Sequence, residues 1–132
     1  MADTPSPMNP VGWFEIYVSD MARAKKFYET VFKQPLENMP MGPDSTDMQM
    51  CTFPMQAGAS GSPGALVKSA QVGPGGGGTL VYFNCEDCAI EAGRAATAGG
   101  KLTLPKKGIG EYGFIALVQD TEGNMIGLHS RK

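Results

Sequence analysis

Hydrophobic and polar positions along the first half of the chain predict a strand, a helix and three further strands. Residues 12–18 are aromatic and β-branched and alternate between two faces, which is typical of a strand. Asp20 can cap the next helix, in which apolar residues recur at three- and four-residue spacings until Pro35 ends it. Three shorter extended segments, separated by turns rich in Pro, Gly and Ser, are expected at residues 36–39, 48–53 and 64–68.

The same order of elements returns in the second half of the chain. Residues 79–84 predict a strand, and Asp87 can cap a helix that runs to about Ala98, where Gly99 and Gly100 favour its end. Three more extended segments are then expected at residues 101–104, 114–119 and 124–129.

This repetition predicts an α+β fold built from two tandem βαβββ modules, at residues 11–69 and 79–132. A Gly-rich linker at residues 70–78 joins the modules, and residues 1–10, with three prolines, are expected to be a flexible lead-in. A module of roughly sixty residues has a marginal core when alone. We therefore expect both modules to form a single domain over residues 11–132.

Composition and charge narrow the classes of partner. The 132 residues hold 11 Lys+Arg and 13 Asp+Glu, a net charge of −2, so neither nucleic acid nor an anionic membrane surface is an expected partner. No apolar run approaches the roughly 18 residues of a spanning helix, and the first residues lack the features of a signal peptide. We expect a cytoplasmic protein.

Lys106 and Lys107, beside glycines, predict a solvated charged turn.

The three cysteines do not describe a disulfide framework, because their number is odd and the chain is long enough to form a core. Cys85 and Cys88 have the C-x-x-C spacing of redox proteins, but the preceding strand does not belong to a thioredoxin-like pattern. We expect no redox function, and the sequence leaves open whether the two are joined. Cys51 is expected to be a small buried hydrophobic residue.

Three segments carry a resemblance to a known family: residues 14–28 (FEIYVSDMARAKKFY), 82–87 (YFNCED) and 120–129 (DTEGNMIGLH). Together they resemble the vicinal oxygen chelate superfamily, which includes glyoxalase I, bleomycin-resistance proteins, extradiol dioxygenases and fosfomycin-resistance enzymes. The resemblance implies paired βαβββ modules that form a cupped mixed sheet around a cavity. It also implies a homodimer, because members of this family are commonly dimeric.

Chelating members of this family hold a divalent metal with residues on the first and last strands of each module. By this resemblance, three of the ligand positions fall on Trp13, Leu80 and Gly127, and residues 64–68 contain no carboxylate for the remaining one. None of these side chains offers the oxygen or nitrogen donor that such metals need. We therefore expect neither a metal nor another cofactor.

Glu15 and His129 each lie two residues beyond one of these ligand positions, so strand alternation places each on the same sheet face as that position. One hypothesis is a catalytic pair in the cavity, with Glu15 as base and His129 as donor. The alternative is that His129 is solvated and that Glu15 bonds backbone groups. The sequence leaves both interpretations open.

A small hydrophobic or aromatic molecule is the expected ligand. Its predicted contacts are Trp13, Tyr17, Leu80, Tyr82 and Gly127. Five methionines fall where a cavity wall is expected, and their flexible side chains suit an irregular apolar ligand, although ordinary core filling is the favoured explanation for any single one of them. They are Met39, Met41, Met48, Met50 and Met55.

Two functions of different classes follow from the sequence. The first is a glyoxalase-like lyase or isomerase that works by acid–base chemistry without a metal. The second is a binding protein that sequesters its ligand without turnover, as bleomycin-resistance proteins of this family do. Conventional glyoxalase I or dioxygenase activity is not expected, because both require a bound metal.

Overall fold

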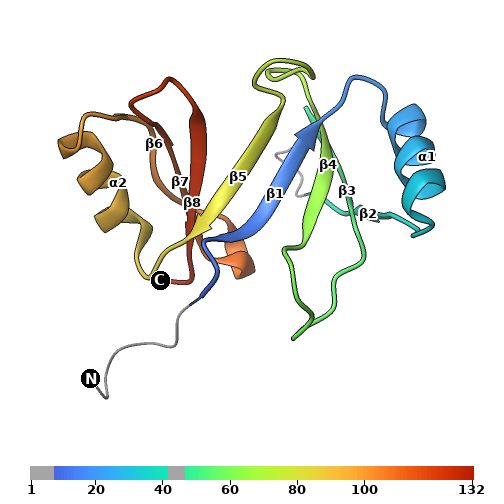
Figure 1. The fold of residues 1–132 in the computed structure, drawn as a ribbon, viewed down its shortest axis with the longest axis horizontal. Coiled ribbons are helices and arrows are strands. Elements are labelled where there is room, and N and C mark those ends of the chain that lie inside the picture. Colours follow the sequence, from blue (N-terminus) through green and yellow to red (C-terminus); the bar gives the residue numbers. More distant parts are fainter. Residues whose placement is uncertain (1–7, 42–46) are drawn as a thin grey trace. The chain divides into compact units, whose positions relative to one another are not determined.

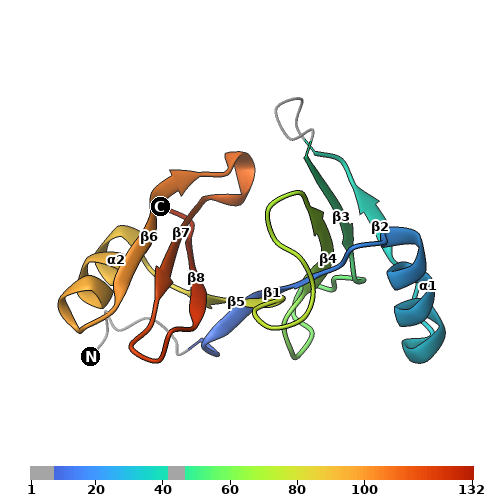
Figure 2. The same ribbon diagram turned by 90° about the horizontal axis from the view of Figure 1, so that it is seen from above.

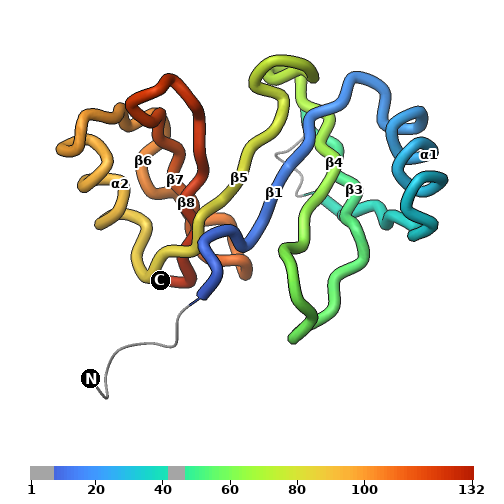
Figure 3. The backbone as a smooth tube through the Cα atoms, in the orientation of Figure 1, coloured from blue at the N-terminus to red at the C-terminus, as the bar shows by residue number. Residues whose placement is uncertain are grey.

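The computed structural model describes residues 8–41 and 47–132 (Figures 1 and 3). In chain order the elements are β1 (Val11–Tyr17), α1 (Met21–Phe32), β2 (Glu37–Met39), β3 (Met48–Thr52), β4 (Gly64–Ser69), β5 (Thr79–Asn84), α2 (Cys88–Thr97), β6 (Lys101–Gly108), the short 3-10 helix η1 (Gly110–Tyr112), β7 (Phe114–Gln119) and β8 (Met125–Ser130). Neither α-helix in this part of the chain has the length and apolar character that crossing a membrane requires. Most of the predicted lead-in, residues 1–7, lies outside the described residues.

The predicted α+β fold is confirmed, because the order βαβββ occurs twice. The chain divides into two compact units, which we describe separately. The N-terminal unit is Trp13–Val81, and the C-terminal unit is Tyr82–Lys132 together with the residues up to Gly12. The predicted module bounds and the single domain remain predictions.

In the N-terminal unit the strands lie in the order β2-β3-β4-β1, with β1 parallel to β4 and the other pairs antiparallel. Helix α1 starts after Asp20, whose carboxylate accepts a hydrogen bond from the N–H of Arg23 at 3.0 Å, so the predicted cap is confirmed. The helix packs against a buried cluster on one face of this sheet. Its buried members are Val18, Leu36, Cys51 and Leu66.

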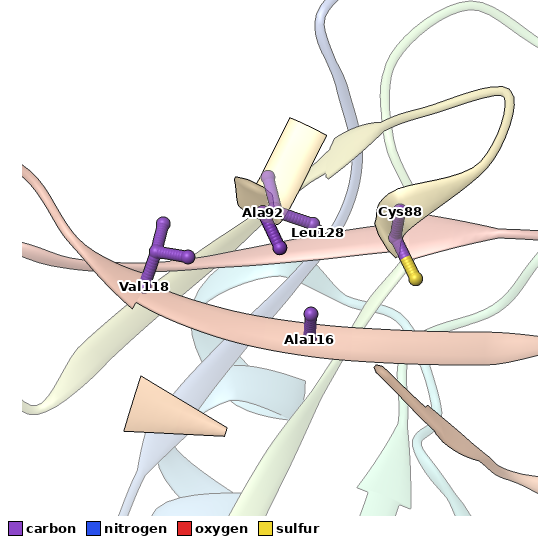
Figure 4. Close-up of a cluster of buried hydrophobic side chains, with 5 residues drawn as sticks. All are labelled: Cys88, Ala92, Ala116, Val118 and Leu128. Atoms are coloured by element: carbon purple, nitrogen blue, oxygen red, sulfur yellow. The ribbon is translucent and has the colours of Figure 1, made fainter. Parts of the chain in front are cut away.

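In the C-terminal unit the strand order is β5-β8-β7-β6. Asp87 caps α2 as predicted, and its carboxylate accepts a hydrogen bond from the N–H of Ala89 at 3.1 Å. Small side chains on α2 allow the helix to pack closely on β7 and β8 (Figure 4). The buried cluster consists of Cys88, Ala92, Ala116, Val118 and Leu128.

The turn between β7 and β8 explains one of the motifs in the sequence. The Asp120 carboxylate accepts hydrogen bonds from the N–H groups of Glu122 and Asn124, each at 2.8 Å. Gly123 has φ 87°, a conformation that suits glycine. Hydrogen bonds led by that from Asn124 hold the pKa of Asp120 below its ordinary value. The D-T-E-G-N motif therefore builds a turn.

The prediction that Lys106 lies in a solvated turn is wrong. Strand β6 continues to Gly108, because Lys107 pairs with Ile115 and Gly108 pairs with Phe114 on β7. The Lys106 ammonium lies 2.9 Å from a carboxylate oxygen of Asp87 and 4.6 Å from the centroid of the Phe114 ring. Local composition favours a turn here, but strand pairing and this ion pair order the segment.

Candidate functional site

The two faces of β1 have different surroundings. Ile16 and Val18 belong to the cluster that packs against α1, and the Phe14 ring lies 5.7 Å from the Phe53 ring beside that cluster. Strand alternation places Trp13, Glu15 and Tyr17 on the other face. We call these three residues the Glu15 triad. These contacts confirm the prediction that Phe14, Ile16 and Val18 share one face, the face that packs against α1.

The carboxylate of Glu15 is held by its two neighbours in the triad. Its Oε2 accepts a hydrogen bond from the indole N–H of Trp13 at 3.1 Å, and its Oε1 accepts one from the hydroxyl of Tyr17 at 2.8 Å. The residue is only 9% exposed. These bonds come from side chains, whereas one sequence-based interpretation expected backbone donors. A carboxylate has about four acceptor positions, so two remain for another group.

Strand β4 gives the triad an apolar neighbourhood. Ala65 is the register partner of Glu15, and Val67 is the partner of Tyr17. Partners in adjacent strands share a sheet face, and both residues are fully buried. A buried carboxylate in such surroundings is costly unless it is hydrogen-bonded. The bonds from Trp13 and Tyr17 meet that need.

The last family ligand position, Gly127, has no room for a side chain. Gly127 on β8 is the register partner of Tyr82 on β5. A Cβ atom added at Gly127 would clash with the Tyr82 ring, which is itself buried. The aromatic ring therefore occupies the space that an acidic side chain at this position would need.

The residues at the family ligand positions do not fit a metal. The indole N–H of Trp13 is used by Glu15, Leu80 is a buried apolar side chain, and Gly127 has no side chain. Within residues 8–41 and 47–132, no group of three or more His, Cys, Asp or Glu residues could hold a metal ion. We derive no chemistry through a family-type metal.

His129 lies on β8 in the C-terminal unit, where its neighbours define its tautomer. Its Nε2 lies 2.6 Å from the backbone carbonyl oxygen of Tyr112 in η1. A carbonyl oxygen only accepts hydrogen bonds, so Nε2 carries a hydrogen and is the donor of this hydrogen bond. In the neutral ring Nδ1 is then an acceptor, and His129 becomes a donor at Nδ1 only as imidazolium.

The predicted pairing of Glu15 with His129 remains a prediction. Glu15 belongs to the N-terminal unit and His129 to the C-terminal unit. Within each unit, Glu15 binds Trp13 and Tyr17, and His129 binds the Tyr112 carbonyl. The hydrogen bond from His129 was not predicted, because no pattern in the sequence indicates η1.

The three cysteines are free thiols. Burial, together with the nearby Glu91 carboxylate, raises the pKa of Cys85 to about 11, so it is a thiol at neutral pH. Cys88, the first residue of α2, is fully buried in the cluster between α2 and the strands β7 and β8. Cys51 is buried as predicted. Redox chemistry needs an accessible thiolate, which these surroundings do not provide for Cys85 or Cys88.

One cavity of the N-terminal unit was not predicted. It has a volume of about 310 Å³ and lies among the end of β1, the start of α1 and the glycines before β5. Tyr17, Arg23 and Gly78 are among its lining residues. The carbonyl of Gly78 accepts a hydrogen bond from the N–H of Tyr17 at 2.8 Å, and the linker at residues 70–78 remains a prediction. The run of glycines before β5 was the feature of the sequence that could have indicated this cavity, but it was interpreted only as a linker.

The comparisons with known proteins agree on one type of fold. A sequence model of the Glyoxalase/Bleomycin resistance protein/Dioxygenase superfamily matches residues 11–128. Methylmalonyl-CoA epimerase from Mycobacterium tuberculosis is 13% identical, with a TM-score of 0.65 over 93% of this chain and 88% of that chain. A hypothetical protein from Bacillus halodurans is 11% identical, with a TM-score of 0.68 over 92% of this chain and 94% of that chain.

A variant of Streptomyces coelicolor methylmalonyl-CoA epimerase, in complex with 2-nitronate-propionyl-CoA, is also similar. It is 12% identical, with a TM-score of 0.66 over 94% of this chain and 95% of that chain. A search of curated protein sequences found no match. At such identities the structural similarity concerns the fold alone.

Proposed function

Because the chain belongs to the glyoxalase/bleomycin resistance protein/dioxygenase superfamily, we propose that it binds a small organic molecule at the Glu15 triad, without a family-type metal. The ligand has a hydrophobic or aromatic body and an N–H or O–H group that donates a hydrogen bond to Glu15. The carboxylate of Glu15, held at both oxygens on a largely apolar face, is the observation that carries this proposal.

The chemistry of the triad supports this class of ligand. The rings of Trp13 and Tyr17 offer apolar surface, while their N–H and O–H groups orient the Glu15 carboxylate. A ligand with a donor uses an acceptor position that remains on Glu15. A ligand without a donor displaces water from the carboxylate but makes no hydrogen bond in its place, and this loss lowers its affinity. Glu15 therefore selects for a donor group.

Three further residues complete the proposed set of ligand contacts. Leu80 is a buried apolar residue of the N-terminal unit. Tyr82 and Gly127 form their own aromatic surface in the C-terminal unit, where the ring lies over the glycine. Leu80 and Gly127 stand at ligand positions of the family, and none of the three residues supplies a charge. Leu80 is proposed to contact the apolar body of a ligand in the N-terminal unit, and Tyr82 with Gly127 is proposed as an apolar ligand contact of the C-terminal unit.

Acid–base catalysis without a metal is a second candidate function, favoured by the tautomer of His129. The bond from Nε2 to the Tyr112 carbonyl leaves Nδ1 of the neutral ring as a proton acceptor. A fixed imidazole of this kind can remove a proton from a bound molecule, as lyases and isomerases require. In this form of the proposal His129 is the base, and it acts from the C-terminal unit.

Ligand binding is tested by thermal shift measurements with matched pairs of compounds. Aromatic amines and alcohols are compared with ethers of the same shape, which lack the donor. CoA thioesters are included because two of the similar structures are methylmalonyl-CoA epimerases. We expect donor compounds to raise the melting temperature, since a ligand that binds only the folded state stabilises it.

Glu15→Gln is the decisive variant, and Glu37→Gln, at an exposed site on β2, is its matched control. The shift caused by a donor compound should fall in Glu15→Gln and persist in Glu37→Gln. An equal shift in both variants would show that Glu15 is not the anchor.

Turnover separates the two candidate functions once a ligand is found. The ligand is incubated with chelator-treated protein and followed by NMR. Consumption that is lost in His129→Asn, while the thermal shift remains, identifies an enzyme. An unchanged ligand spectrum identifies a binding protein. Turnover that requires an added divalent metal contradicts the metal-free proposal.

A further inference from the structure

Strands β2 and β3 pair in the N-terminal unit (Figure 2), and four methionines belong to these strands or closely follow them in the sequence. Met39 is the register partner of Met50, so the two side chains share a face. Met48 lies two residues before Met50 on β3 and therefore also lies on that face. Met41 follows Met39 at the same spacing. We call Met39, Met41, Met48 and Met50 the methionine cluster.

The methionine cluster lines a single cavity. The cavity has a volume of about 330 Å³, and a fifth methionine, Met21 at the start of α1, also lines it. Its other lining residues are Asn38, Gln49 and Cys51, so no carboxylate or imidazole contributes. Of the five methionines grouped from the sequence, Met55 does not line the cavity and is largely exposed.

Ordinary core filling does not explain the cluster. The buried cluster of this unit consists of Val18, Leu36, Cys51 and Leu66, and contains no methionine. All four members of the methionine cluster are half-buried, and all four line the cavity. A purely apolar role would be served equally well by leucine. What the four side chains share is a thioether.

Thioether sulfur is a soft, neutral metal ligand. Such ligands select Cu(I), whereas Mg²⁺ and Ca²⁺ require oxygen and Zn²⁺ takes thiolate, imidazole or carboxylate. Met39 ends β2 and Met48 and Met50 lie on β3, so pairing and alternation bring these three side chains to one face, and Met41 closely follows β2. Long, flexible side chains allow several sulfurs to converge on one ion.

We propose that Met39, Met41, Met48 and Met50 form a binding site for Cu(I) through their thioether sulfurs. This inference is independent of the proposed function, because it uses neither the Glu15 triad nor His129. Cys51 also lines the cavity, but its S–H donates a hydrogen bond to Oδ1 of Asn38 at 3.0 Å, and it belongs to the buried cluster. Burial also raises its pKa. We therefore assign it no ligand role.

The test is an anaerobic titration with Cu(I), supplied as its acetonitrile complex and buffered by the chromophoric chelator bicinchoninate. The protein carries methyl-labelled methionine, so each thioether reports separately by NMR. We expect the methyl signals of the methionine cluster to shift. The signals of Met55 and Met125, which are exposed and lie away from the cavity, should not shift.

Two paired variants test the role of sulfur. Met39→Leu with Met50→Leu keeps the apolar volume, so we expect the fold to persist while Cu(I) affinity falls about tenfold or more. Met55→Leu with Met125→Leu is the matched control and should bind as the unaltered chain does. If circular dichroism shows that the first pair is unfolded, Met41→Leu with Met48→Leu replaces it.

The proposal fails if Cu(I) binds with equal affinity to the cluster variants and the control variants. It also fails if only cysteine signals respond while the methionine methyls remain unchanged, because Cu(I) is then held by thiols. An apolar ligand that binds this cavity equally in the leucine variants, together with no Cu(I) binding, would identify a hydrophobic pocket and overturn the metal assignment.

Discussion

The Tyr82 ring and Gly127 form one packed pair, and this gives a prediction at the scale of single residues. Gly127→Ala should lower the free energy of unfolding by about 1–3 kcal/mol, because the added methyl group clashes with the buried ring. The measurement is urea denaturation. Gly93→Ala is the control, since nothing lies near that position on α2, and it should raise stability by about 0.5–1 kcal/mol. Similar losses in both variants would contradict the clash.

Cys85 gives a second prediction at this scale. Its pKa of about 11 lies two units above the ordinary value of 9.0. Because the thiolate is the reactive form, its alkylation by iodoacetamide at pH 7.5 should be about a hundredfold slower in the folded protein than in urea. Peptide mass spectrometry measures both rates. Equal rates would show that burial does not protect this thiol.

At the scale of single residues, the sequence predicted the features that depend only on neighbouring positions in the chain. Asp20 and Asp87 were predicted as caps because a cap depends only on the next few residues. The hydrogen bonds to Glu15 were not predicted, although Trp13 and Tyr17 were placed on its face, because they depend on side-chain rotamers. The tautomer of His129 depends on a carbonyl seventeen residues away.

At the scale of elements, the start of α2 depends on pH. Asp87 both caps the helix and binds Lys106, and the hydrogen bond from Lys106 is the main cause of its lowered pKa. A lowered pKa means that the ionised group stabilises the fold above its ordinary value of 3.8. This contribution is lost as the pH falls below that value and the carboxylate is protonated.

Asp87→Asn tests this contribution, because asparagine keeps a capping oxygen but not the charge. We expect the variant to melt at a lower temperature than the unaltered chain at pH 7, and the difference to shrink as the pH falls through the lowered pKa of Asp87. Glu86→Gln, which removes only an exposed carboxylate from a long ion pair with Lys132, should show little change. A difference that persists unchanged in acid would contradict the ionic role.

The sequence predicted each strand and both α-helices, but not η1, because periodicity and end signals agree along most of the chain. Strand β6 was predicted too short, since its last residues pair with β7 despite their turn-like composition. The hydrogen bond from the N–H of Tyr17 to the carbonyl of Gly78 was not predicted, because it joins distant parts of the sequence. Both features depend on long-range pairing.

At the scale of the whole molecule, we predict a homodimer. The family resemblance implies one, and α1 exposes large apolar side chains that an interface would bury, with Phe27 at 58% and Phe32 at 59% exposure. Light scattering should give about twice the chain mass of 13.9 kDa. Phe27→Glu should weaken the association, while Lys26→Glu serves as a control for charge. A monomer at all concentrations would contradict the prediction.

The packed pair of Tyr82 and Gly127 also bears on how this chain could evolve. A carboxylate at residue 127 becomes tolerable only after the ring at residue 82 has become smaller, so the two positions constrain each other's mutations. Each change alone carries a penalty, either a clash or a cavity. A single substitution at residue 127 therefore cannot add a carboxylate to this position of β8 without a loss of stability, and the order in which mutations arise determines which side chains residue 127 can reach.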